Sequence, residues 1–175
     1  MVPKDAVQTA GVIAAVVSAF AMALVANTTA SAEPWCGTDS LSLSTGALTS
    51  TEYVGQDQLE LVLTNTSAQS CTMQGYPGVD LVGPDVPTWG PVFSLRRQSG
   101  DPEPFTLEPG ASASSILTFG APGAPEDVWL PTTIVVTPPD ATTQLEVPWI
   151  PGYFPVLRQD GATSPATYVG PLQPT

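Results

Sequence analysis

The sequence predicts an all-β protein: an immunoglobulin-like β-sandwich with one disulfide, preceded by a signal peptide. Three observations lead to this prediction. Apolar residues recur with period two, and Pro or Gly interrupts each apolar stretch before a helix forms. About seven or more short strands, roughly ten residues apart, are separated by turn signals. The two cysteines of the chain both follow an N-terminal segment of export type. A β-barrel is the alternative architecture for the same strands.

The first element is an apolar run from Ala10 to Ala26 that contains no charged residue. Lys4 precedes the run and Ala30-Ser31-Ala32 follows it, which is the order of a signal peptide: a basic start, an apolar core and an A-x-A cleavage site. Cleavage after the triplet leaves a chain whose length is typical of one domain. We therefore expect a signal peptide at 1–32 and a single secreted β-sandwich with a proline-rich C-terminal tail at 33–175. An uncleaved membrane anchor is the alternative.

The strand predictions rest on alternation and on β propensity. Leu59, Leu61 and Leu63 point to one face of a strand, so this strand packs on a core by its leucine face. The β-branched run TTIVVT at 132–137 has the strongest strand propensity, and 144–147 pairs with it as a hairpin. Further strands are predicted at 41–43, 71–73, 79–82, 92–97, 105–107 and 112–119, and the C-terminal tail adds the apolar segments 153–157 and 168–169.

Turn residues separate these strands. Asn65-Thr66-Ser67 and Gly75-Tyr76-Pro77-Gly78 are turns, because glycine supplies positive φ angles and proline a fixed φ. Proline-interrupted loops are predicted at 84–91 and 101–104, and a further turn at 108–110. We expect prolines on loops and edge strands to block edge-to-edge pairing.

The cysteines, Cys36 and Cys71, are predicted to form one structural disulfide, because an exported chain meets an oxidising compartment. The bond closes a loop of about 35 residues, for which the chain-entropy model gives roughly 3 to 4 kcal/mol. A catalytic thiol is the alternative, and it requires a histidine or another cation nearby. The chain contains no histidine.

The charge balance excludes some partners. Sixteen acidic and four basic residues give a net charge of −12, and removal of 1–32 takes one of each. Such a surface repels nucleic acid and anionic membranes, because phosphate binding requires clusters of Lys and Arg. After cleavage the cations are Arg96, Arg97 and Arg158. We interpret the acidity as a means of solubility outside the cell.

The residue types of this chain lack the groups that most hydrolases and metalloenzymes use for catalysis. Without histidine there is no Ser-His-Asp triad, no Cys-His pair and no His-ligated metal, so we expect no enzyme activity, no cofactor and no metal centre. The close carboxylate pairs are Asp101 with Glu103 and Glu126 with Asp127, and a glycosidase needs two carboxylates about 5 to 10 Å apart across a cleft. Asp80, Asp85 and the loop at Asp101 are candidate calcium ligands, but these acids do not have the spacing of an EF-hand.

Aromatic and basic residues favour a binding module instead. Trp89, Trp129 and Trp149 lie beside prolines or in loops, where aromatic rings stack on sugars or fill a partner's pocket. The structural alternative is that these rings are core tryptophans or cover the ends of the sheets. Arg96 and Arg97 form a basic pair suited to a carboxylate of a cell-wall polymer, with a solvated strand end as the alternative.

Several motifs carry a family resemblance. The order of Cys36, LVLTNTSAQSCTMQGYPGVDL at 61–81, FTLEPGASASSILTF at 105–119 and TTIVVTPPD at 132–140 resembles the actinobacterial secreted domain of unknown function family 4232. The resemblance covers nearly the whole chain after the signal peptide. Its most specific residues are Asn65-Thr66-Ser67, Cys71-Thr72 and Gly75-Tyr76-Pro77-Gly78, with support from Leu107, Pro109-Gly110 and Ala113.

The resemblance implies an extracytoplasmic immunoglobulin-like β-sandwich and carries no catalytic residue onto this chain, since the family has no established activity. Typical members have a second cysteine pair in the C-terminal half, where this chain has the segments 122–129 and 151–154 instead. We expect packing by Trp129, Trp149 and Phe154 to replace that disulfide.

The sequence thus predicts a secreted, non-catalytic protein that binds or organises a component of the cell envelope or a protein partner, with no nucleic-acid partner and no membrane contact once the signal is removed. The alternative is a carboxylate-based hydrolase of envelope polymer, which requires a cleft with two facing acids. A purely structural surface protein is a third interpretation.

Overall fold

Strands make up all the regular secondary structure that the computed structural model describes, which covers residues 33–123, 128–150 and 154–175. These residues belong to one unit of the chain, Ala32–Thr175. They contain no helix, and so none that is long and apolar enough to cross a membrane. The predicted signal peptide, 1–32, lies outside the described residues. The prediction of an all-β fold is confirmed.

The larger sheet has six strands in the order β1-β2-β8-β13-β6, with β14 also paired to β8. The neighbours are antiparallel, except that β13 runs parallel to β6. Its strands are β1 (Leu41–Ser50), β2 (Gln56–Asn65), β6 (Arg96–Arg97), β8 (Ser112–Gly120), β13 (Tyr168–Val169) and β14 (Gln173–Pro174).

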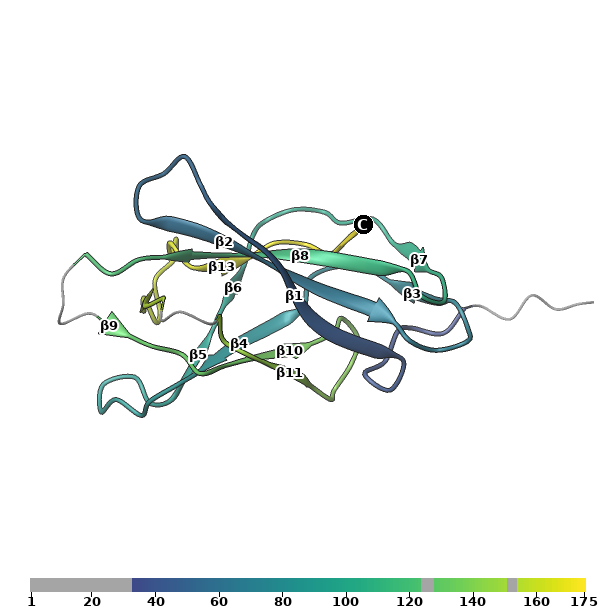
Figure 1. Cartoon of the computed structure of the whole chain (residues 1–175), viewed down its shortest axis with the longest axis horizontal. Helices are drawn as coiled ribbons and strands as arrows, with labels where there is room; N and C mark the ends of the chain where they lie inside the picture. Colours follow the sequence, from purple (N-terminus) through teal and green to yellow (C-terminus); the bar gives the residue numbers. More distant parts are fainter. Residues whose placement is uncertain (1–32, 124–127, 151–153) are drawn as a thin grey trace, which may run out of the picture. The chain divides into compact units, whose positions relative to one another are not determined.

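A second sheet has four antiparallel strands in the order β11-β10-β4-β5, and two short strand pairs join β9 to β12 and β3 to β7. Figure 1 shows β2, β8 and β13 in one layer and β4, β5, β10 and β11 in the other. None of these sheets of described residues closes into a barrel. The remaining strands are β3 (Cys71–Met73), β4 (Gly78–Val82), β5 (Val92–Ser94), β7 (Phe105–Leu107), β9 (Val128–Trp129), β10 (Thr133–Thr137), β11 (Leu145–Pro148) and β12 (Val156–Leu157).

The core lies between the two sheets and is built by alternation along the strands. Leu59, Leu61 and Leu63 of β2 are all buried, as the leucine pattern predicted. Leu59 and Leu61 pack in one cluster with Leu117 and Phe119 of β8, because the register pairs Leu59 with Leu117, whereas Leu63 belongs to a second cluster. The second sheet contributes the buried side chains of Val79, Leu81, Ile134 and Val136. The residues between the inward-facing ones point out of the sheet.

The predicted disulfide between Cys36 and Cys71 is present, with the two Cα atoms 5.0 Å apart. It joins the first described residues to β3, where the Cys36 amide also donates to the carbonyl of Thr72. Around the bond lies a second buried cluster that includes Met73 and Leu107. The disulfide therefore closes one end of the domain.

The structure divides one predicted strand and adds two short ones. The segment predicted as a single strand at 92–97 is split: Phe93 pairs with Leu81 in the four-stranded sheet, whereas Arg96 pairs with Tyr168 in the larger one. The chain thus crosses from one layer to the other at Leu95, a step that apolar periodicity does not reveal. The two-residue strands β9 and β14 are too short for a periodic signal.

Candidate functional site

The tryptophans singled out from the sequence lie in different places. Trp129 on β9 is 2% exposed and Trp149 is 6% exposed, and both belong to the main core. Trp129 Nε1 donates to the Pro84 carbonyl and Trp149 Nε1 to the Phe154 carbonyl, each at 3.0 Å. The core-packing alternative accounts for both rings, which offer no surface to a ligand in this structure. Trp89 is 40% exposed.

Trp129, Trp149 and Phe154 do pack in the half of the chain that has no second disulfide. Trp129 pairs across β9 and β12 with Val156, and its ring meets Phe93 edge-on, with centroids 6.4 Å apart. Trp149 meets Phe119 in the same way at 5.2 Å, and Phe154 packs against the same core. Apolar packing and two indole hydrogen bonds therefore hold this region of the structure.

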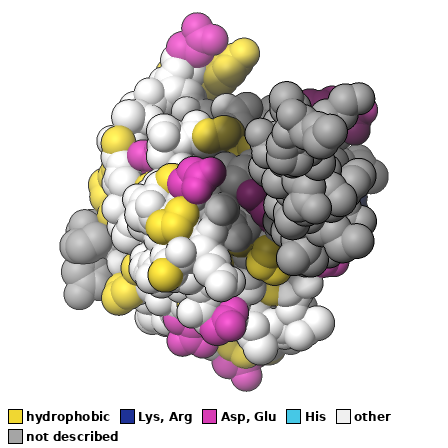
Figure 2. Space-filling model, turned by 90° about the vertical axis from the view of Figure 1, so that its right-hand side faces the viewer, with side chains coloured by type: hydrophobic (Ala, Val, Ile, Leu, Met, Phe, Trp, Pro, Cys, Tyr) yellow, Lys and Arg dark blue, Asp and Glu magenta, His cyan; other side chains and the backbone are white. Residues whose placement is uncertain are grey.

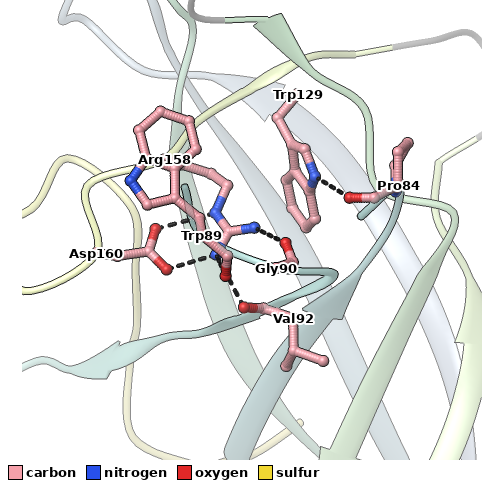
Figure 3. Close-up of polar contacts among 7 residues, drawn as sticks. All are labelled: Pro84, Trp89, Gly90, Val92, Trp129, Arg158 and Asp160. Carbon is pink, nitrogen blue, oxygen red and sulfur yellow. Dashed lines mark hydrogen bonds and ion pairs between the residues drawn. The ribbon is translucent and has the colours of Figure 1, made fainter. Parts of the chain in front are cut away.

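Arg158, which the sequence marks only as one of the three cations after the predicted signal peptide, forms a cluster of hydrogen bonds with one loop and with Asp160. It follows β12, and its side chain is completely buried. Figure 3 shows the guanidinium surrounded by carbonyls of the loop that leads into β5. Its donors reach the carbonyls of Gly90 (2.7 Å), Val92 (2.9 Å) and Trp89 (3.1 Å) and the carboxylate of Asp160.

Three aromatic rings surround the same guanidinium. Its central carbon lies 4.6 Å from the ring centroid of Trp129, 5.3 Å from that of Phe93 and 5.6 Å from that of Trp89. A cation is attracted to aromatic faces, and the attraction is larger where water is excluded. The Arg158 side chain is buried and its nitrogens already donate within the protein. We therefore interpret the cluster as a structural link between β12 and the loop before β5. It also orients the exposed Trp89 ring.

The candidate binding site is a groove on the outer face of the larger sheet, formed by three adjoining hollows that all include Gln98. We call it the sheet groove. The central hollow has a volume of about 310 Å³, the arginine hollow about 320 Å³ and the loop hollow about 660 Å³. Residues of the outer face alternate along each strand with buried ones, as Gln58 does with Leu59. Their side chains therefore point away from the core.

Strand register places the central side chains in a row. Gln58 of β2 pairs with Thr118 of β8, Thr118 pairs with Tyr168 of β13, and Tyr168 pairs with Arg96 of β6. Directly paired residues present their side chains on the same face of a sheet. Gln58 Nε2 donates to Thr118 Oγ1 at 3.4 Å. The row brings together residues that are more than a hundred positions apart in the sequence.

The central hollow has an uncharged lining. Gln58, Gln98 and Gln173 supply amides, which both donate and accept hydrogen bonds, while Tyr168 and the half-exposed Ile116 supply apolar surface. Ser114, Thr118, Gly170 and Pro171 complete the lining. Such a surface suits an uncharged ligand that is rich in hydroxyl groups.

The two other hollows carry opposite charges. The arginine hollow contains Arg96 and Arg97, both exposed, together with Thr163 and Ser164. Among the residues that the structure describes, neither guanidinium pairs with a carboxylate. The loop hollow contains Asp101 and Glu103. A ligand lying along the sheet groove therefore meets cations on one side and acids on the other.

The hydroxyl of Tyr76 is a buried polar atom of the loop hollow without a hydrogen-bond partner among the described residues. It faces the backbone of Gly100 so closely that a Cβ there would lie 2.7 Å from it. A buried hydroxyl without a partner costs about 1 to 3 kcal/mol. The hydroxyl of Tyr76 is thus a polar group whose hydrogen-bonding capacity is unused among the described residues.

The carboxylates predicted as catalytic or calcium-binding candidates do not form a clustered site. Asp101 and Glu103 are exposed on their loop, and Glu126 and Asp127 lie outside the described residues. Within the described ranges, no three groups of the metal-ligating types gather, and this includes Asp80 and Asp85. On the face drawn in Figure 2, acidic side chains lie at several separate places among uncharged and hydrophobic ones.

Comparison with known families agrees with the motifs. The model of the family described as domain of unknown function DUF4232 matches residues 36–173, which is nearly all of the described domain. The chain belongs to the DUF4232 family. The matched span begins at the first disulfide cysteine and ends in β14, so it contains the Arg158 cluster and the sheet groove. Searches of curated proteins and of solved structures gave no significant match.

Proposed function

We propose that this DUF4232 domain is a non-catalytic, extracytoplasmic binding module whose sheet groove holds a glycan chain of the cell envelope. The observation that carries the proposal is the uncharged, amide-lined central hollow beside two exposed arginines. Sugars present hydroxyl groups that both donate and accept, as glutamine amides do, and apolar faces that pack on Tyr168 and Ile116.

The arginine hollow gives the proposal a second element of specificity. Arg96 and Arg97 lie beside Tyr168, which also lines the central hollow, so a glycan crossing this hollow places an acidic substituent against the guanidinium groups. Arginine binds carboxylates through paired, charge-assisted hydrogen bonds. We therefore favour a carboxylate-bearing glycan over a neutral one.

Two features support the location and the absence of catalysis. The Cys36–Cys71 disulfide is stable in an oxidising compartment outside the cytoplasm. The acids of the sheet groove, Asp101 and Glu103, stand on an exposed proline-rich loop rather than facing each other across a closed cleft. Their placement is unlike the buried acid and opposed carboxylate of a glycosidase.

The test is co-sedimentation of the purified protein with two insoluble polymers, one carboxylate-bearing envelope glycan and one neutral polysaccharide. Tyr168→Ala and Gln98→Ala are expected to weaken binding of both polymers about tenfold, since each removes contacts made in the central hollow. The double variant Arg96→Ala/Arg97→Ala is expected to weaken only the acidic polymer. Gln69→Ala, at an exposed glutamine outside the groove, is the matched control. Equal binding by all variants, or no binding by the wild type, would refute the proposal.

A further inference from the structure

The edge strands of the two large sheets differ in how well they are protected against pairing with a strand of another molecule. Four edge strands are short and carry charge or proline at or beside the strand: β6 consists of two arginines, β14 has two residues and ends at Pro174, β5 has three residues after Pro91, and β11 contains Glu146 and ends at Pro148. Charges, prolines and short length are the devices by which proteins prevent edge-to-edge pairing. The remaining edge, β1, has ten residues, LSLSTGALTS, with neither a charge nor a proline.

The free side of β1 presents unused backbone groups. Among the described residues only β2 pairs with it, and residues 44–50 are all exposed. The Thr66 amide donates to the Ser40 carbonyl, and hydrogen-bonded positions of an antiparallel pair recur at every second residue. Leu43 and Thr45 therefore point their N–H and C=O groups away from β2.

The same alternation continues beyond the bulge. The register shifts between Thr45 and Leu48, and the Thr51 amide donates to the Gln56 carbonyl. Every second residue back from Thr51 therefore bonds to β2. The residues in between, Leu48 and Ser50, point their backbone N–H and C=O groups away from β2. The start of β1 packs beside Leu145 of β11, so the part of the strand that can serve as a template for another strand is the exposed stretch 44–50.

We propose that this domain forms a symmetric dimer in which β1 pairs antiparallel with β1 of a second copy. A twofold axis sets residue i against residue j and residue j against residue i, so that a charge near the axis would meet its own copy. The absence of charge from β1, in a chain with sixteen acids, removes this obstacle. The larger sheet then continues across the axis as one sheet of the dimer.

Charge near the edge sets the salt dependence of the dimer. Asp57 and Glu60 belong to the neighbouring strand β2, but both carboxylates reach β1: the Ser50 hydroxyl donates to the Asp57 carboxylate at 2.7 Å, and the Glu60 carboxylate lies directly over Gly46. In the dimer these acids would repel their copies across the new strand pair, and salt screens this repulsion. Association should therefore strengthen with ionic strength.

Antiparallel pairing about a twofold axis perpendicular to the sheet leaves the outer faces of both copies on the same side. β1 contributes no residue to the hollows of the sheet groove, so both grooves stay open. A dimer would present two grooves to one polymer and raise its avidity. The dimer itself does not depend on what the grooves bind.

Sedimentation equilibrium of the purified protein, from about 1 μM to about 1 mM and at about 0.05 M and 0.5 M NaCl, tests the proposal. The wild type is expected to shift from monomer to dimer with concentration, and at lower concentration in the higher salt. Thr45→Asp places a charge on the edge, and Thr45→Pro removes an outward donor without changing charge. Each should raise the dissociation constant at least about tenfold.

Thr88→Asp changes the net charge equally on an exposed loop and should dimerise like the wild type. Thermal unfolding of each variant establishes that it is folded. A wild type that stays monomeric over the whole range overturns the proposal without any variant. So does a dimer that survives both Thr45 substitutions, since it must use another surface.

Discussion

Replacing Arg158 by methionine gives the sharpest test of how the second half of the domain is held together. Methionine keeps much of the apolar volume between Trp129 and Phe93, but it leaves the carbonyls of Trp89, Gly90 and Val92 without their donor. An unsatisfied buried acceptor costs about 1 to 3 kcal/mol, although some of the three regain water when the loop relaxes. The Asp160 carboxylate is 31% exposed and adds less, because solvent screens it.

We expect Arg158→Met to lower the free energy of unfolding by about 3 to 5 kcal/mol, a large share of the roughly 5 to 15 kcal/mol of a typical domain. Arg158→Lys keeps the charge but not the planar fork, so its loss should be smaller yet above about 1 kcal/mol. Arg97→Met, at an exposed arginine, should stay within about 0.5 kcal/mol of the wild type.

The assay is urea unfolding followed by tryptophan fluorescence, which reports on Trp89 and Trp129 beside the guanidinium. The midpoint should fall with the slope unchanged, since a change of slope would indicate an altered unfolded or native state. A loss below about 1 kcal/mol for Arg158→Met would refute the reasoning. It would mean that apolar packing alone holds the loop, as it does in proteins where a buried ion pair is replaced without loss.

Three further changes test other parts of the structure. Removing the disulfide as Cys36→Ala/Cys71→Ala should cost roughly 3 kcal/mol in chemical unfolding, because the open loop regains conformational entropy. Asn65→Ala should cost about 2 to 3 kcal/mol in thermal unfolding: the buried amide donates to the carbonyls of Gln69 and Leu107 and its oxygen accepts from Ser67. Tyr76→Phe should leave stability unchanged or raise it by about 1 kcal/mol, because it removes a buried hydroxyl that has no partner among the described residues.

A specific result would contradict each of these three predictions. A disulfide variant as stable as the wild type would show that the second core cluster closes the domain unaided. Full stability of Asn65→Ala would mean that water replaces the amide at the turn. A loss above about 1 kcal/mol for Tyr76→Phe would show that the hydroxyl is bonded in solution.

Local pattern anticipated most of the strands and little of the candidate site. The leucine face of β2, the hairpin of β10 and β11 and the Cys36–Cys71 bond follow from alternation, β propensity and cysteine count, which are properties of short segments or of composition. The edge β1 is different. Its stretch from Ser44 to Ser50, STGALTS, shows no regular apolar alternation, and the strand extends that far because β2 pairs with it.

The tryptophans show why proximity to proline is a weak guide to exposure. Trp129 and Trp149 stand beside loops in the sequence, yet each turns into the core and satisfies its indole nitrogen on a carbonyl. Burial depends on which layer covers the side chain, and the covering residues come from distant strands. Arg158 is the converse case, since an arginine after two apolar residues gives no hint that three rings will enclose it.

The fold class, the family motifs and the disulfide can be read from the amino-acid sequence, because they depend on the period of apolar residues and on residue type. The set of residues that meet in the sheet groove depends instead on how the strands are arranged in space. Gln58, Gln98 and Gln173 become neighbours because β2 and β14 both pair with β8, and because β6, which Gln98 follows, joins the same sheet through β13. The exposed edge of β1 is likewise a property of the tertiary structure, because only the complete sheet shows which strands lack a neighbour on one side.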